Sequence, residues 1–594
     1  MKSEKRNPLS YLFSKIWEFS QGNRKNVVLY WILFIFANVI NTVFHPIVMA
    51  KIMDVLQKDG ITKNNISLLY FLLGLTLVND LVFWAFHGPA RVIERVNAFK
   101  ARMNYKKFLL SGVMNLPLPW HIDHHTGDTI DKAEKGTTAL YSFSKESFEV
   151  ISSFVQLIVS FCMLAYFGVE AITIVVVMMA IAIWIIIRFD QVLIPQYVSL
   201  NKSENQISQG IIDSISNIGT IIVLRVEKYV FEALSRKMEK PLGLFCKNAK
   251  VNEGKWFLTN LCCTIMSILV MALYFWKKIG TNPAVLVAST FLLFRYLEKI
   301  SELFFRFVGR YSDIVIYKTR IANSEELSND FVTGSFANHV LPKDWKKLEI
   351  KKLNFSYHIE GDSDLHLEDV SLSVLRGEKI VFVGETGSGK TTMLKVMRDL
   401  YQPKSVELSV DGQIISDGFA GIARAIALVP QKPEIFATTI LENITVGVDY
   451  EMGFVRHFTD MTHFTEVALN LPNGFDSSVK EDGLDLSGGQ QQRLALSRGL
   501  LACYDKEIVL LDEPTSSLDA ITEITVYQNI LREFKEKTVI STTHGLHLLP
   551  FFDRICFFSK GRILATGTLD ELLTSCPEFV NLWSATQKAS TEIV

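Results

Sequence analysis

The feature of the sequence that most restricts its fold is a series of long apolar runs in the first half of the chain. Each run contains about twenty mostly apolar residues, the length that a helix needs to cross the hydrocarbon core of a bilayer. The stretch AITIVVVMMAIAIWIII, at 171–187, is too continuous for the alternative, a core helix of a soluble domain. We therefore predict an all-α transmembrane domain with six spans, at 27–56, 66–90, 147–167, 170–188, 256–276 and 281–307.

Charge and cysteine content narrow the class of protein further. The net charge of −1, from 61 Lys and Arg against 62 Asp and Glu, predicts no nucleic-acid partner. The seven cysteines are scattered without a CxxC pair, which disfavours a disulfide framework or a zinc site. The amphipathic stretch at 8–20 is expected either to lie along the membrane surface or to form an ordinary cytosolic helix.

The second half of the chain has a different character. Residues 326–346 are polar and broken by Gly and Pro, which is typical of a linker. After them, short strand-like runs alternate with helical patterns, as in an α/β domain. The sequence thus predicts a membrane domain with long cytosolic helix extensions at 1–325, a linker at 326–346 and an α/β domain at 347–594.

A phosphate-binding loop follows a predicted apolar strand at 380–383. Its residues have the spacing of such a loop, and they are Gly384, Glu385, Thr386, Gly387, Ser388, Gly389, Lys390 and Thr391. Glycines let several backbone N–H groups point at one phosphate, and the helix that begins with Thr391 and Thr392 aims its dipole at the same place. Lys390 would reach the β- and γ-phosphates, and the Thr391 hydroxyl would ligate Mg²⁺.

Two carboxylates stand at the end of a second apolar run, Ile508 to Leu511. Such a run is typical of a fully buried parallel strand, whose carboxyl end faces the ligand crevice. There Asp512 would hold Mg²⁺ through water, and Glu513 would act as the general base for an attacking water. The alternative, a carboxylate pair that caps the next helix, does not account for the phosphate-binding loop.

The segment between these motifs carries a resemblance to a known family. Ser487, Gly488, Gly489 and Gln490 resemble the signature of the ATP-binding cassette (ABC) family, whose other elements follow in the expected order. The resemblance implies that the signature binds the ATP held by the phosphate-binding loop of a second copy. It also implies that the loop at 516–519 crosses this dimer interface.

The resemblance also assigns three single residues. Tyr357 would stack on adenine, Gln431 would reach the metal and the attacking water, and His544 would contact the γ-phosphate as the switch histidine. The sequence departs from the family pattern at 544–546, where His-Gly-Leu replaces His-Arg-Leu, and at Pro514, which replaces Ala. Neither change removes a group that touches phosphate, so we expect hydrolysis to be retained.

The order of the parts resembles an exporter-type half-transporter, with one membrane domain and one cassette per chain. This implies ATP and Mg²⁺ as cofactors and a dimer embedded in a lipid bilayer. A homodimer would have two competent sites, and a heterodimer with a degenerate partner is the alternative. We expect a multi-pass protein of the bacterial cytoplasmic membrane with its ATPase domain in the cytosol.

Three further segments resemble the contacts between the two halves of exporters. The stretch at 478–483 resembles the cassette loop that touches the long intracellular helices. Coupling helices are expected near Pro117–His125 and Asn217–Val226.

Polar side chains inside the predicted spans bear on the cargo, because they usually face a bundle interior or a wet cavity. They share helix faces within the first, second and sixth spans, and they are Asn38, Asn41, His45, Asp80, His87, Arg91, Arg295, Glu298, Glu302 and Arg306. We hypothesise a charged or amphipathic cargo, with simple pairing of the charges at 295–306 as the alternative. An exporter-shaped importer and an ATP-gated channel or regulator remain alternative functions, although intact Glu513 and His544 favour turnover.

Overall fold

The computed structural model of the chain describes residues 7–124, 126–280, 283–331, 341–342, 344–357, 366–432, 434–479 and 486–591. Its contacts divide the chain into two compact units, which are described separately. The first comprises Met1–Asn115 and Thr126–Phe331, and the second comprises Leu116–His125 and Val332–Val594.

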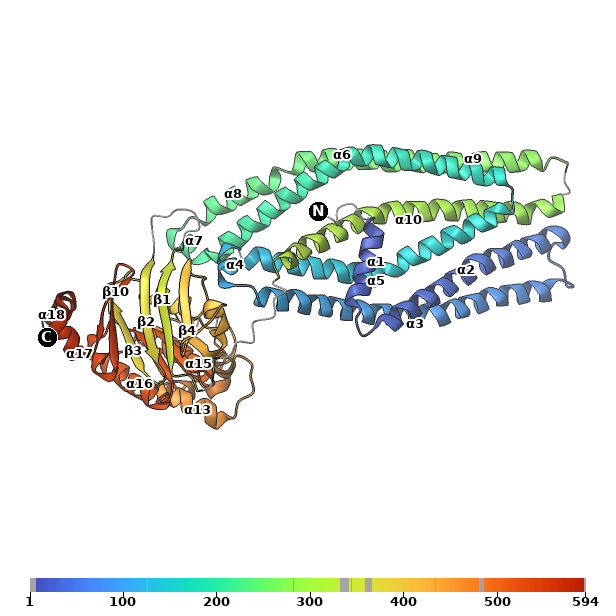
Figure 1. Cartoon of the computed structure of the whole chain (residues 1–594). Coiled ribbons are helices and arrows are strands. Elements are labelled where there is room, and N and C mark those ends of the chain that lie inside the picture. The colour runs from blue at the N-terminus through green and yellow to red at the C-terminus, as the bar shows by residue number, and fades with distance from the viewer. Residues whose placement is uncertain are drawn as a thin grey trace. The chain divides into compact units, whose positions relative to one another are not determined.

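The first unit is helical throughout its described elements (Figure 1). Its helices are α1 (Pro8–Phe19), α2 (Arg24–Asp59), α3 (Ile66–Met114), α5 (Thr126–Ala165), α6 (Val169–Ser216), α7 (Ile218–Leu224), α8 (Glu227–Glu239), α9 (Leu242–Lys277) and α10 (Pro283–Asn329). The long helices pair as neighbours, α2 with α3, α5 with α10 and α6 with α9. The expected all-α fold class of this unit is confirmed.

Five stretches within the described residues are long and apolar enough to cross a membrane. They are α2, α3, α5, α6 and the stretch Glu227–Lys277, which combines α8 and α9. The sixth predicted span is at 281–307, and its described part, 283–307, falls in α10, which is not among these five. The part of α10 between Arg295 and Arg306 also carries Glu298, Lys299 and Glu302, and these charges lower its hydropathy.

Several helices extend well beyond the apolar runs that predict them. The span predicted at 66–90 belongs to α3, which continues to Met114, and the span at 170–188 belongs to α6, which continues to Ser216. Prolines lie inside α2, α3 and α6 without ending them. Transmembrane helices tolerate proline because neighbouring groups satisfy the freed carbonyls.

The amphipathic N-terminal helix α1 packs into the first unit. Its buried residues Tyr11, Leu12, Ile16 and Phe19 form a cluster with apolar side chains of α3, α5 and α10. The Tyr11 hydroxyl donates a 2.5 Å hydrogen bond to the Glu325 carboxylate near the end of α10. The helix is therefore fixed to the bundle by one apolar face.

The second unit contains two β-sheets. An antiparallel sheet has the order β2-β1-β4-β5, with β1 (Lys347–Phe355), β2 (Leu367–Leu375), β4 (Ser405–Val410) and β5 (Gln413–Ile414). The larger sheet has the order β10-β9-β3-β8-β7-β6, and all its neighbours run parallel except β10. Its strands are β3 (Lys379–Gly384), β6 (Ile426–Val429), β7 (Ile508–Asp512), β8 (Thr538–Thr542), β9 (Arg554–Ser559) and β10 (Arg562–Gly567).

Helices complete the second unit. They are α4 (Leu118–Asp123), α11 (Lys390–Met397), α12 (Ile440–Thr445), α13 (Met452–Met461), α14 (Thr465–Leu469), α15 (Gly488–Ala502), α16 (Ala520–Glu533), α17 (Leu569–Ser575) and α18 (Pro577–Thr591). A 3₁₀ helix, η5 (Leu546–Phe551), follows β8. The mixed α/β fold expected for this unit is confirmed.

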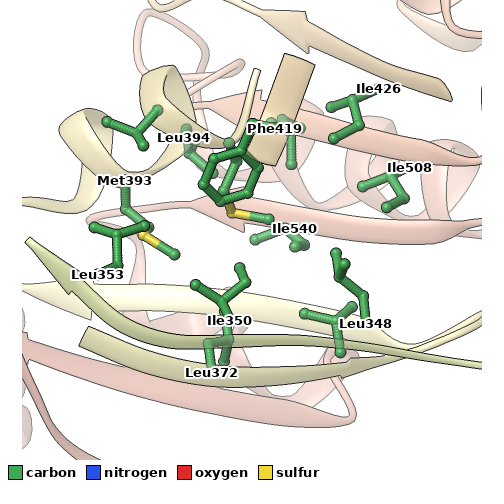
Figure 2. Close-up of a cluster of buried hydrophobic side chains, with 14 of the residues drawn as sticks. Leu348, Ile350, Leu353, Leu372, Met393, Leu394, Phe419, Ile426, Ile508 and Ile540 are labelled. Atoms are coloured by element: carbon green, nitrogen blue, oxygen red, sulfur yellow. The ribbon is translucent and has the colours of Figure 1, made fainter. Parts of the chain in front are cut away.

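One apolar core of the second unit lies between the two sheets (Figure 2). Ile350 and Leu372 of the antiparallel sheet face Met393 of α11. They also face the larger sheet, where β7 contributes Ile508 and β8 contributes Ile540. Every residue of β3, β7 and β8 is buried. Burial on both faces fixes these three parallel strands in register, so their carboxyl ends meet at one edge of the sheet.

Candidate nucleotide-binding site

The predicted phosphate and metal residues gather at the carboxyl ends of β3, β7 and β8. In the sheet, Asp512 at the end of β7 pairs with Thr542 at the end of β8, and Thr542 pairs with Phe382 of β3. The phosphate-binding loop follows β3, Glu513 follows β7 and His544 follows β8. The structure therefore brings together groups that are more than a hundred residues apart in the sequence.

The loop after β3 has a shape that only glycine permits at two positions. Gly384 has φ 151°, and a Cβ there would lie 2.2 Å from the Phe558 carbonyl oxygen. Gly389 has φ 106°, and a Cβ there would lie 2.9 Å from Leu367 Cδ2. The loop is thus a narrow backbone cradle that leaves no room for a side chain at these two positions.

Lys390 occupies the interior of this cradle. It is 5 % exposed, and its Nζ donates hydrogen bonds of 2.8 Å to Gly384 O and 3.0 Å to Glu385 O. Burial lowers the pKa of Lys390. The Ser388 hydroxyl nearby is buried and has no hydrogen-bond partner among the residues that the structure describes. A confined ammonium and an unpaired hydroxyl in a backbone cradle fit the phosphates of a nucleotide.

The next helix begins with the predicted metal ligand. Thr391 Oγ1 donates a 2.8 Å hydrogen bond to Asp512 Oδ1, and Thr542 Oγ1 donates another of 2.8 Å to the same oxygen. Among the residues that the structure describes, no three His, Cys, Asp or Glu side chains cluster as metal ligands. A hydroxyl and one carboxylate fit Mg²⁺, which keeps water and phosphate oxygens in its remaining positions.

Glu513 lies between the other two predicted catalytic residues. Gln431 Nε2 donates a 2.6 Å hydrogen bond to Glu513 Oε2, and His544 Nε2 lies 3.0 Å from Glu513 Oε1. The Glu513 backbone has φ 46° and its N–H donates to Thr542 Oγ1 at 3.0 Å. Left-handed backbone at a non-glycine residue is strained, and this strain turns the carboxylate toward the other two side chains.

The signature residues form the first turn of α15. Ser487 Oγ accepts a hydrogen bond from the Gln490 N–H at 3.3 Å, and Gln490 Oε1 accepts one from the Ser487 N–H at 2.9 Å. A Cβ on Gly489 would lie 3.3 Å from the Ser517 carbonyl oxygen, so the signature packs closely on the 516–519 loop. The two reciprocal hydrogen bonds between Ser487 and Gln490 form a capping box, which satisfies two backbone N–H groups of the turn. The N-terminal end of the helix dipole stays available to an anion.

Tyr357, the predicted adenine-stacking residue, follows β1 and is 39 % exposed. Its ring packs edge-on against Phe355 and Tyr401, and its hydroxyl lies 3.3 Å from Thr392 Oγ1 at the start of α11. The aromatic ring therefore stands beside the helix that begins at the phosphate-binding loop.

Two residues of the site are not among the sequence predictions. Thr542 holds both Asp512 and the Glu513 N–H, and Gln492 Nε2 donates to Glu513 O at 3.3 Å and to Ser516 Oγ at 3.1 Å. Thr542 could be found from its place at the end of a buried strand, next to the switch histidine segment. Gln492 carries no such signal, because two further glutamines precede it.

The predicted coupling segments are helical where the structure describes them. Pro117–His125 contains α4, which groups with the second unit, and Asn217–Val226 contains α7. His125 and residues 480–483 of the exporter-like loop lie outside the described residues.

Polar residues of the predicted spans largely pair with one another. Asn38 Nδ2 donates to Ser152 Oγ at 2.9 Å, and Asn79 Nδ2 donates to Asn41 Oδ1 at 2.9 Å. Arg91 pairs with the fully buried Glu94. The pairing alternative also describes α10, where Arg295 pairs with Glu298 at 2.6 Å and Arg306 pairs with Glu302.

A cavity of about 440 Å³ lies in the first unit among α5, α6 and α10. Its lining is mostly apolar and includes Phe154, Ile183, Ile187 and Phe307. The polar lining groups include the Asp190 carboxylate, which pairs with Lys255 at 3.1 Å. The cavity thus combines a large apolar wall with one paired carboxylate in its lining.

Together, a phosphate-binding loop, an acidic strand end and a helical membrane unit define a nucleotide-binding membrane protein. The model of the ABC transporter transmembrane region matches residues 28–296, and the ABC transporter model matches residues 367–516. The chain belongs to the ABC transporter family, in the exporter-type form with fused membrane and nucleotide-binding domains. It is an integral membrane protein of a family that binds ATP.

The curated relatives include ATP-binding cassette sub-family B member 6 of Mesocricetus auratus, 26 % identical over 84 % of this chain and 59 % of that protein. The human protein of the same name is 26 % identical over 83 % of this chain and 58 % of its own length. The mating factor M secretion protein mam1 of Schizosaccharomyces pombe is 35 % identical over 40 % of this chain and 17 % of that protein. The chain spans less than two thirds of the length of these relatives.

A solved structure of a bacterial Atm1-family ABC exporter with ATP bound has the same fold. It superposes with a TM-score of 0.78 at 20 % identity and covers 95 % of this chain and 98 % of that chain. These relatives come from animals and fission yeast, whereas the solved structure is bacterial, so the bacterial membrane stays a prediction.

Proposed function

We propose that this chain is half of an ATP-hydrolysing exporter that moves an amphipathic cargo by alternating access. The observation that carries this proposal is the Glu513 carboxylate, held between Gln431 and His544 at the end of a buried strand. A regulator or channel does not require such a carboxylate, so its placement favours turnover over the channel alternative. Since ATP is cytosolic, the cassette is placed on the cytosolic side.

The residues of the site suggest the division of chemical roles. The N–H groups of the phosphate-binding loop and Lys390 bind the phosphates, which replace the carbonyl partners that Lys390 has in this structure. Thr391, Asp512 and Gln431 would hold Mg²⁺, which supplies charge neutralisation on the phosphates when bound. Glu513 accepts a proton from the attacking water, and His544 contacts the γ-phosphate.

The arrangement of the signature supports a site completed by a second copy of the chain. Ser487 and Gln490 hold each other in the first turn of α15, and Gly488 and Gly489 keep that turn free of bulky side chains. Such a turn is suited to a phosphate that a partner chain presents. Because the catalytic residues of this chain are all present, we propose a homodimer with two active sites.

Mixing two inactive variants tests both hydrolysis and the shared site. We expect purified Lys390→Ala and Ser487→Arg proteins each to lack ATPase activity in lipid. A mixed dimer would contain one intact site, formed by Lys390 of one copy and Ser487 of the other. Random exchange of subunits should therefore restore about a quarter of the wild-type ATPase rate.

Each variant alone, carried through the same exchange procedure, is the control for that experiment. A wild-type protein that lacks ATPase activity without a companion chain contradicts the homodimeric ATPase. Wild-type activity with no recovery in the mixture contradicts the shared site alone.

The cavity among α5, α6 and α10 supports an amphipathic cargo. Its apolar wall matches the apolar part of such a molecule, and the Asp190 carboxylate, which pairs with Lys255, offers an acceptor to a polar group. The ion pairs within α10 weaken the case for a purely charged cargo, because those charges already satisfy one another.

Filling the cavity should uncouple cargo from hydrolysis. We expect Ile187→Trp, which adds an indole to the cavity wall, to lower cargo-stimulated ATPase activity by about tenfold and to leave basal activity within about twofold. The measurement is ATPase activity in lipid against a panel of lipids, peptides and drugs. Ile181→Trp is the matched control, since Ile181 is exposed on the same helix and does not line the cavity. Equal effects of the two substitutions would contradict a cargo site there.

A further inference from the structure

The loop after the switch histidine contains an interaction that the proposed chemistry does not use. His547 Nε2 lies 3.0 Å from Glu523 Oε2, and Glu523 Oε1 accepts a 2.7 Å hydrogen bond from Thr515 Oγ1. His547 belongs to η5, Glu523 to α16, and Thr515 comes two residues after Glu513. One carboxylate thus connects the segment after the general base to the segment after the switch histidine.

The three side chains differ in exposure. Thr515 is 2 % exposed, and the Glu523 and His547 side chains are 14 % and 41 % exposed. The backbone around His547 is held on both sides, because Leu546 and Leu548 are buried in the apolar cluster beneath it. A polar contact that is partly exposed to solvent adds little to folding stability on its own. The contacts among His547, Glu523 and Thr515 are therefore better explained by the positioning of the two loop segments than by a contribution to folding stability.

Gly545 explains why His547 can reach this carboxylate. A Cβ on Gly545 would lie 2.9 Å from His547 Cε1 and 3.4 Å from Glu523 Oε2. The missing side chain leaves the space that the imidazole ring occupies. This glycine is also the position at which the sequence departs from the His-Arg-Leu pattern, so the departure and the histidine two residues later form one local arrangement.

We propose that His547 is a positioning residue. It acts through Glu523 and Thr515 to hold the segment that carries Glu513 and the segment that carries His544 in fixed positions relative to each other. The inference rests on the proposed hydrolysis. The contact that it maintains is the 3.0 Å approach of His544 Nε2 to Glu513 Oε1. A shift of either segment would move these groups relative to a bound γ-phosphate, and such small displacements reduce turnover more than binding.

A double-mutant cycle tests this role in the full chain reconstituted in lipid. We expect His547→Ala to lower kcat for ATP hydrolysis by about 5- to 10-fold and to leave KM for ATP within about twofold. Gly545→Ala should have a similar effect, because its methyl group displaces the imidazole ring. In the His547→Ala background the same Gly545→Ala change should have almost no effect, since the ring is already absent.

Two further variants separate positioning from general loosening of α16. His547→Gln retains an N–H donor for Glu523 and should recover most of the lost turnover. His457→Ala removes a comparable pair, His457 Nε2 to Glu533 Oε2 at 2.9 Å, from the other end of α16, and should leave kcat unchanged. An additive cycle, or a lowered melting temperature with unchanged kcat, overturns the proposal.

Amide hydrogen exchange gives a readout that does not depend on ATP turnover. His547→Ala should accelerate exchange at 513–519 and 543–547, and Gly545→Ala should do so only when His547 is present. Absence of turnover in the wild type would contradict the proposed function, whereas unchanged exchange in these variants would overturn the positioning role.

Discussion

Glu513→Gln is expected to lower kcat for ATP hydrolysis by about 10²- to 10⁴-fold, the usual contribution of a general base. An amide cannot take the proton of the attacking water, yet it has nearly the same shape as the carboxylate. The glutamine oxygen can still accept from Gln431 Nε2, which now lies 2.6 Å from Glu513 Oε2. The variant should therefore retain ATP and accumulate as a closed dimer, measured as phosphate release and bound nucleotide after desalting.

Glu507→Gln is the matched control for this experiment. Glu507 comes directly before β7, at the end of the strand opposite Glu513, and its side chain makes a long pair with Arg376, at 3.6 Å. We expect this variant to hydrolyse ATP at the wild-type rate. Near-normal turnover by Glu513→Gln would remove Glu513 from the role of general base, and failure to bind ATP would show that its side chain is needed for the shape of the site.

Gly384→Ala should abolish ATP binding and destabilise the cassette. The new Cβ would lie 2.2 Å from a backbone carbonyl oxygen, at Phe558, which cannot rotate away as a side chain can. The φ of 151° adds backbone strain. We expect a loss of at least about 2–3 kcal/mol of folding stability and no measurable ATP affinity, because the loop must change its path. Thermal unfolding and nucleotide titration measure the two effects.

Gly412→Ala separates the strain of left-handed backbone from the clash. Gly412 also has positive φ, at 82°, but a Cβ there meets nothing within 4 Å. It lies in the turn between β4 and β5. We expect a loss of about 1 kcal/mol with normal ATP affinity. Similar nucleotide affinity in both variants would mean that the path of the loop after β3 is not needed for binding.

Much of the nucleotide site could be predicted from the sequence because parallel strands impose their own geometry. Continuous apolar runs before Gly384 and Glu513 indicate buried strands, and buried parallel strands present their carboxyl ends at one edge. The convergence of these residues therefore follows from local patterns. The position of Thr542 at the end of a buried strand follows from the same patterns. Its hydrogen bonds to Asp512 and to the Glu513 N–H do not, because these partners come from β7 and the residue after it.

The membrane unit was harder to predict in detail. Spacings of three and four residues around Arg295 and Arg306 are equally compatible with pairing along one helix and with a charged cavity, and the structure contains the pairs. Hydropathy locates only the apolar spans within α3 and α6 and leaves the lengths of the predicted cytosolic extensions open, since it does not detect the polar part that continues each helix.

Likewise, the connection through His547 could not be foreseen. It depends on the absence of a side chain at Gly545, and a missing methyl group carries no signal about which neighbour fills its space. The fold alone brings the imidazole of His547 to Glu523 across that gap.

The hydrogen bonds of Lys390 to Gly384 O and Glu385 O bear on the release of ADP. When the Lys390 ammonium exchanges carbonyl acceptors for phosphate oxygens, the binding free energy gains only the difference between the two sets of hydrogen bonds. It does not gain the full free energy of a new ion pair. The loop also keeps an internal partner when the nucleotide leaves, so emptying it does not strand a buried charge. In the proposed hydrolysis, these internal hydrogen bonds of Lys390 would therefore favour the release of ADP.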